Sequence, residues 1–176
     1  MKIKIGFAAM LVCFAFALNV SAQKAGATQF TSIYTNMTTD CKVLKGGEGQ
    51  DDAKLCKGAA GYQIRLYYSA ASAHILAEKK GTDDSVPVAT LSVGFNESKT
   101  KLEWRLANGK PFAVIMRTPT YADPAGDEQY YGKVNGEKLV VVGLVGFNIG
   151  GEVDAKTADA NVKAREIADK GYNEKK

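Results

Sequence analysis

The chain has few residues of the kinds that carry catalytic chemistry. Its 176 residues include a single histidine, His74, and three cysteines. Catalysis by a serine or cysteine nucleophile usually requires a histidine base, and a structural zinc site needs about four ligands. The glycine-rich nucleotide loops and the HExxH pattern are missing from the sequence. We therefore expect no cofactor and no metal, and we assign His74 to a structural or surface position.

An excess of charge of one sign is also lacking. The chain has 23 lysines and arginines against 19 acidic residues, a formal net charge of +4. Removal of the N-terminal segment discussed below takes away two lysines and leaves about +2. Nucleic acids and anionic membranes select proteins with larger basic clusters. The composition thus indicates neither partner.

Residues 1–22 have the pattern of a secretory signal peptide. Lys2 and Lys4 precede an apolar run over 5–18, and the small residues of 20–22 stand just before Gln23. A transmembrane anchor is the alternative, but the run is short for a bilayer. We expect cleavage after residue 22, a secreted or periplasmic protein without a membrane span, and a single domain over 23–176.

Two cysteines, Cys41 and Cys56, remain after the expected cleavage. They form no CxxC motif, and no set of histidines accompanies them. An even pair of cysteines in an exported protein predicts a disulfide. The glycine- and aspartate-rich stretch between them predicts a clamped hairpin or loop.

The clearest element is a β-hairpin over 102–117. Two apolar runs flank Asn108-Gly109, the pair that tight two-residue turns favour. With these residues at the centre of the turn, Trp104 pairs with Ala113. The same register pairs Glu103 with Val114. The fully apolar run 112–116 predicts an inner strand.

Further strands are expected at 29–35, 62–69, 86–95 and 139–151, where apolar residues alternate or run together. Residues 73–78 fit either a strand or a helical turn, and 118–138 have the composition of a long surface loop. A C-terminal helix is expected over 154–172, with Asp154 or Thr157 as its cap. A stripe of small residues at helical spacing lets this helix approach a sheet closely, and it consists of Ala160, Ala164, Ile167, Ala168 and Gly171. Arg165 and Asp169 are spaced for an ion pair within the helix. These elements predict an α+β fold in which a mainly antiparallel, twisted sheet of about six or seven strands packs against the helix.

Two surfaces are candidates for binding. Glu103, Arg105 and Arg117 lie on the two hairpin strands, where they can recognise an acidic ligand or a peptide terminus. An ordinary ion pair between Glu103 and Arg105 is the alternative.

The second surface is the segment 121–131. Tyr121, Tyr130 and Tyr131 stand there beside acidic residues, as in tyrosine-rich surfaces used for protein recognition. A plain surface loop is the alternative.

Several short segments resemble a group of exported bacterial proteins of unknown function. These are EWR at 103–105, PFAVIMR at 111–117, VDA at 153–155 and ANVKAREIAD at 160–169, preceded by the two cysteines and by Gly61-Tyr62. The resemblance implies a secreted single domain and supplies no activity. Members of that group have further cysteines late in the chain, which this sequence lacks.

These observations predict a non-enzymatic binding or inhibitor-like module that acts on another protein in the periplasm or outside the cell. The first alternative is a structural or stress-related factor of the cell envelope that holds no ligand. The second is a small hydrolase that uses carboxylates, and the acids available for it are Glu97, Glu103, Asp123, Asp127 and Glu128.

Overall fold

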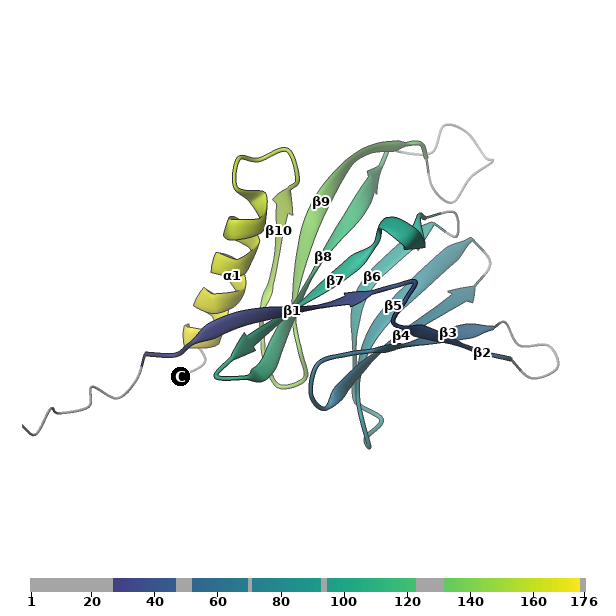
Figure 1. Ribbon diagram of the computed structural model, residues 1–176. Coiled ribbons are helices and arrows are strands. Elements are labelled where there is room, and N and C mark those ends of the chain that lie inside the picture. The colour runs from purple at the N-terminus through teal and green to yellow at the C-terminus, as the bar shows by residue number, and fades with distance from the viewer. Residues whose placement is uncertain (1–26, 47–51, 70, 93–94, 123–131, 175–176) are drawn as a thin grey trace, which may run out of the picture.

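The computed structural model of the protein describes residues 27–46, 52–69, 71–92, 95–122 and 132–174 (Figure 1). The predicted leader peptide, Tyr130 and Tyr131 lie outside these ranges. The described elements are β1 (Phe30–Asn36), β2 (Cys41–Leu44), β3 (Ala53–Lys57), β4 (Tyr62–Ser69), β5 (Ser72–Lys79), β6 (Ser85–Ser92), the short 3-10 helix η1 (Glu97–Lys99), β7 (Lys101–Ala107), β8 (Lys110–Tyr121), β9 (Val134–Gly143), β10 (Gly150–Asp154) and α1 (Ala160–Glu174).

The strands form two antiparallel sheets of five strands each, which we call sheet I and sheet II. Sheet I has the order β1-β7-β8-β9-β10, and sheet II has the order β2-β3-β4-β5-β6. The α+β class is confirmed, whereas the expected single sheet of six or seven strands is wrong. The alternating patterns of 62–69 and 73–78 do belong to strands, but these strands build a second layer instead of extending the first.

The main core lies between the two sheets. Trp104 of β7 and Leu66 of β4 are both fully buried there, together with Ile75 of β5. The strands β4, β5 and β7 each contribute alternate residues to it, as the two-residue period of a strand requires. Thr35 joins the layers inside this core: its hydroxyl accepts a hydrogen bond from Trp104 Nε1 at 2.9 Å and donates one to the carbonyl of Lys57 at 2.6 Å.

A third layer is the helix α1, which lies against β8, β9 and β10 on the face of sheet I that points away from sheet II (Figure 1). Ala160, Ala164 and Ala168 are buried at this contact. Small side chains let the helix approach the sheet closely, so the predicted small-residue stripe does face the sheet. The helix begins at Ala160, later than the expected Asp154, which is the last residue of β10.

The hairpin turn is confirmed, but its register is not the one predicted. Asn108 and Gly109 have φ values of 49° and 78°, which the tight turn requires. Trp104 pairs with Val114, and not with Ala113, because a bulge shifts the register between Arg105 and Leu106. Glu103 correspondingly pairs with Ile115.

The bulge explains how the apolar run of β8 serves two cores. Phe112 and Ala113 both belong to the cluster beneath the helix, although they are consecutive in the chain. Val114 and Met116 face the core between the sheets. An extra residue in one strand of a pair is the feature that allows two neighbours to share a face.

Three further expectations are settled. Residues 73–78 are strand, within β5. The stretch 118–138 contributes to two strands: β8 extends to Tyr121, and β9 begins at Val134. The run 139–151 belongs to two strands, because the chain bends after Gly143, where an added Cβ would lie 2.4 Å from the carbonyl oxygen of Phe147.

Two connections carry the chain between the sheets, and they lie side by side. Residues 37–40 lead from β1 to β2, and the stretch containing η1 leads from β6 back to β7. Met37 N donates to the carbonyl of Thr100 at 3.2 Å and joins the two. Beyond the first connection, Cys41 and Cys56 lie directly opposite each other on β2 and β3 and form the predicted disulfide.

The described helices do not include one that could serve as a membrane span. The only α-helix among them has 15 residues, and no helix in the described ranges combines the length and the hydrophobicity that a bilayer crossing needs.

Candidate binding site

Glu103 and Arg105, two of the residues predicted to bind a ligand, lie beneath the helix and hold it to sheet I. Arg165 donates to Glu103 through Nε at 2.7 Å and Nη2 at 3.1 Å. Arg105 donates to Asp169 through Nε at 2.7 Å and Nη2 at 2.5 Å. Ser32 Oγ donates to Glu103 and accepts from Arg105. The geometry therefore gives these two strand residues partners within the protein.

This network also replaces the pairing expected within the helix. Arg165 and Asp169 are four residues apart and were expected to pair with each other, but each pairs instead with a residue of β7. The hydrogen bonds and the charge of Glu103 raise the pKa of Arg165 above its ordinary value. The side chain of Glu103 is only 9% exposed, so this carboxylate depends on its partners for solvation.

Arg117 and Tyr121, which the sequence placed on two separate candidate surfaces, line one pocket. It has a volume of about 460 Å³ and lies where the distal end of β8 meets η1. Lys99, Lys101 and Arg117 bring positive charge to its wall. Phe95, Pro119 and Val134 supply apolar surface, and we call this site the cationic pocket.

Among the described residues, two of the three cations of the cationic pocket have no acidic partner. Lys99 and Lys101 are exposed and make no ion pair with any described residue. Arg117 has one acidic neighbour, Glu137, at 3.3 Å, and both side chains are well exposed. An exposed pair of this kind is worth little and exchanges readily with a ligand.

A smaller pocket of about 230 Å³ shares the same three cations on its side toward the helix. It extends to Tyr34 and to Asn161 in the first turn of α1. The main-chain N–H groups of a helix's first turn carry partial positive charge. Glu103 also lines the smaller pocket, and its carboxylate is paired with Arg165. The three cations shared by the two pockets therefore favour the binding of a carboxylate or a phosphate.

Tyr121 has a defined position in the cationic pocket. Its hydroxyl accepts a hydrogen bond from the main-chain N–H of Ser92 at 3.1 Å, so the ring bridges the ends of β8 and β6. The predicted partners Tyr130 and Tyr131 are outside the described residues. Gly132, which follows them, lines the same pocket.

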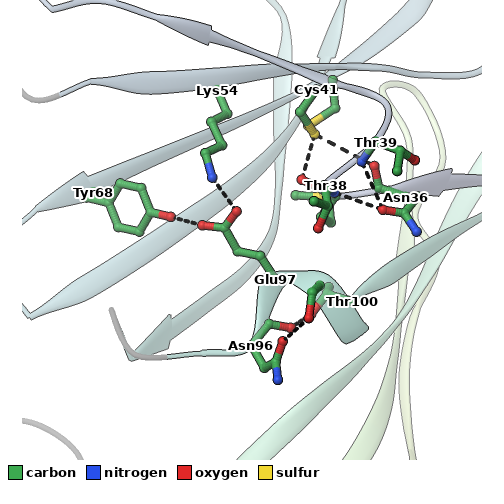
Figure 2. A network of polar contacts seen from close by, with 12 residues as sticks. Asn36, Thr38, Thr39, Cys41, Lys54, Tyr68, Asn96, Glu97 and Thr100 are labelled. Atoms are coloured by element: carbon green, nitrogen blue, oxygen red, sulfur yellow. Dashed lines mark hydrogen bonds and ion pairs between the residues drawn. A yellow bond between two sulfur atoms is a disulfide. The ribbon is translucent and has the colours of Figure 1, made fainter.

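Glu97, which the sequence analysis named only as an acid available to a hydrolase, makes contacts that the sequence did not predict. It lies on η1, and its carboxylate contacts Lys54 of β3 and the hydroxyl of Tyr68 on β4 (Figure 2). Burial, followed by the hydrogen bond and the charge of Glu97, raises the pKa of Tyr68 above its ordinary value. The three side chains link η1 to β3 and β4 near the connections between the sheets.

His74 lies on the outer face of sheet II. Its ring stacks on Tyr67 with centroids 4.8 Å apart, and Nε2 is 2.7 Å from Ser69 Oγ. The opposite nitrogen faces Thr90 Oγ1 at 3.4 Å, where a catalytic triad has a carboxylate. A triad is therefore not completed at this histidine among the described residues. The described ranges also contain no group of three or more metal-ligating side chains.

Comparison of the chain with models of protein families, with curated proteins and with solved structures gave no match. The functional argument therefore depends on the geometry of the molecule alone.

Proposed function

We propose that the protein is an exported, non-enzymatic binding module that captures an acidic segment of another protein in the cationic pocket. The observation that carries the proposal is the convergence of Lys99, Lys101 and Arg117 beside Tyr121. Cations beside an aromatic ring are the combination that binds carboxylates flanked by apolar side chains. By covering the acidic segment of its partner, such a module would block other contacts of that segment, as an inhibitor does.

Export is part of this proposal. The first 22 residues have the features of a signal peptide, and the Cys41–Cys56 disulfide is of the kind that persists in oxidising compartments. We place the protein in the periplasm or outside the cell.

The two alternative functions lack a specific observation in their favour. The carboxylates that a hydrolase would need include Glu97 and Glu103, and each of these holds separate ion pairs with neighbouring strands or the helix. The remaining acids named for this role are outside the described residues. A purely structural factor would have no need of Lys99 and Lys101, which lack an acidic partner among the described residues of the pocket.

The proposal is tested by binding of a fluorescent, capped polyglutamate peptide to the purified protein, followed by fluorescence anisotropy. Reversing two charges with Lys99→Glu and Lys101→Glu should weaken binding by about tenfold or more, since each removed contact is worth roughly 1 kcal/mol. Raising the salt concentration should weaken binding of the unaltered protein, because the contacts are exposed.

The matched control changes the same net charge elsewhere. Lys110 and Lys163 are both exposed, at the start of β8 and on the helix, respectively. The variant Lys110→Glu/Lys163→Glu should bind the peptide nearly as well as the unaltered protein. Equal loss in both variants would show that net charge alone attracts the peptide, and absence of binding at millimolar peptide would refute the site.

A further inference from the structure

A second cleft lies beside the outer edge of sheet II, at its last strand β6. It has a volume of about 430 Å³ and is lined by residues 88–91 of β6 and 118–121 of β8, with Lys138, Val140 and Glu152 from β9 and β10. We call it the edge cleft. It shares Pro119 and Tyr121 with the cationic pocket but contains none of the three cations.

Thr118 forms part of the wall of this cleft and has an unsatisfied hydroxyl. The residue is 3% exposed, and its Oγ1 has no hydrogen-bond partner among the described residues. Buried polar groups in folded proteins nearly always have a partner, and an exception calls for an explanation. The explanation we favour is that a ligand in the cleft supplies the missing hydrogen bond.

The opposite wall of the cleft is the outer edge of β6, the last strand of sheet II. Ser92 N donates to Tyr121 across this edge, so the main chain of Ser92 faces away from β5. The two-residue period of a strand turns Thr90 the same way. The side chain of Thr90 points to the outer face of the sheet, where it contacts His74. Because Thr90 nevertheless lines the cleft, we infer that its main chain forms this part of the wall.

The charges at the cleft cancel. Lys138 Nζ lies 2.6 Å from Glu152 Oε1, and the remaining lining is aliphatic or hydroxyl-bearing, with Val88, Leu91 and Val140 among it. A cleft of this composition favours an uncharged ligand with small apolar groups and its own hydrogen-bonding groups. A polypeptide main chain in the extended conformation combines these properties.

We propose that the edge cleft binds an extended, uncharged peptide segment of a partner protein, which adds to sheet II along β6. Main-chain hydrogen bonds to Thr90 provide the pairing, as in other cases of strand addition. A small aliphatic side chain enters between β6 and β8, and a main-chain or hydroxyl group of the peptide pairs with Thr118. The inference rests on the proposed role in protein binding but uses different residues from the cationic pocket.

The experiment uses hydrogen exchange of the full protein with a pool of capped peptides of about six residues, a typical strand length, composed of alanine, valine, leucine, serine and threonine. We expect the pool to slow exchange of the Thr90 amide. Selected binders should lose about fivefold in affinity to Thr118→Val, since one hydrogen bond contributes roughly 1 kcal/mol. N-methylation of alternate peptide nitrogens should abolish their binding.

The variant Lys99→Glu/Lys101→Glu separates this inference from the proposed function, because it should bind the neutral peptides normally while losing the acidic one. No protection of β6 by the pool, or binding that is indifferent to both Thr118→Val and N-methylation, would overturn the edge cleft and leave the cationic pocket unaffected. Protection of Thr90 that rises with protein concentration alone would identify a second copy of the chain as the occupant and would equally overturn the proposal.

Discussion

Arg165 on the helix and Glu103 on β7 meet face to face, with Nε 2.7 Å from Oε1 and Nη2 3.1 Å from Oε2. The two residues are 62 positions apart in the chain. Next to them Arg105 and Asp169 form a second such pair with the order of charges reversed. The helix therefore contacts the sheet in two ways. Its buried alanines pack against sheet I, and the two ion pairs fix its position along the sheet.

Arg165→Ala should lower the free energy of unfolding by about 3 kcal/mol, because it leaves the buried carboxylate of Glu103 without its counter-charge. Glu103→Gln should cost less, about 1 kcal/mol, since the Arg165 side chain is 34% exposed and water can solvate it. Urea unfolding followed by tryptophan fluorescence measures both, because Trp104 lies in the main core.

Lys163→Ala is the control for this pair of variants. Lys163 is exposed on the same helix, and its loss should change the free energy of unfolding by less than about 0.5 kcal/mol. If Arg165→Ala were as mild as the control, the ion pair would not contribute to stability.

Local signals in the sequence were sufficient for much of the fold. Asn108-Gly109 fixed the turn of the hairpin because only a few residue pairs adopt two consecutive positive φ values. The alternation of 62–69 predicted β4 with its observed bounds. The regular spacing of small residues predicted the face of α1 that contacts the sheet.

The remaining features depend on contacts between distant segments. The strand β8 supplies side chains to two cores, and the bulge in its pairing with β7 next to Arg105 allows it to do so. The hydrophobic pattern of the strand does not indicate where such a bulge lies. The same alternation suits one sheet or two, so the division into layers was not predictable. Glu103 and Arg105 became candidates for binding because the helix residues that pair with them are more than 60 positions away.

Reduction of the Cys41–Cys56 disulfide should lower the free energy of unfolding by about 3 kcal/mol, the amount expected from releasing a loop of this length in the unfolded chain. Urea unfolding with and without a thiol reductant measures the difference. The variant Cys41→Ala/Cys56→Ala should be insensitive to the reductant. A thiol-labelling assay that finds both cysteines reactive in the native protein would contradict the pairing.

Two threonines should respond in opposite directions to the same substitution. Thr35→Val removes a hydroxyl that accepts from Trp104 and donates to Lys57, so it should lower the free energy of unfolding by about 2 kcal/mol. Thr118→Val removes an unpartnered buried hydroxyl, so it should raise the free energy of unfolding by about 1 kcal/mol. Both residues are 3% exposed, which makes the comparison direct in urea unfolding.

A loss of stability in Thr118→Val similar to that in Thr35→Val would mean that the Thr118 hydroxyl is satisfied in the free protein, for example by ordered water. The edge cleft would then lack its unsatisfied group.

Tyr68 should make the protein sensitive to alkaline pH. Burial and the neighbouring carboxylate of Glu97 raise the pKa of its phenol in the folded state above the ordinary value of 10.0. The neutral phenol is thus favoured by folding, so its contribution to stability is complete below about pH 10 and is lost as the pH rises toward the folded-state pKa. The free energy of unfolding should therefore fall as the pH rises across this range. In Tyr68→Phe the slope of this fall should be smaller, by part of the ~1.4 kcal/mol per pH unit that one titrating proton contributes.

Glu97→Gln tests the cause of this shift. Removal of the negative charge takes away one of the contributions that raise the pKa of Tyr68, so its ionisation should move to lower pH, although burial will hold it above the ordinary value. Ultraviolet absorbance of tyrosinate reports the ionisation, and the difference between the titrations of the unaltered protein and Tyr68→Phe isolates this one phenol. If Glu97→Gln left that difference unchanged, the carboxylate of η1 would have no influence on Tyr68.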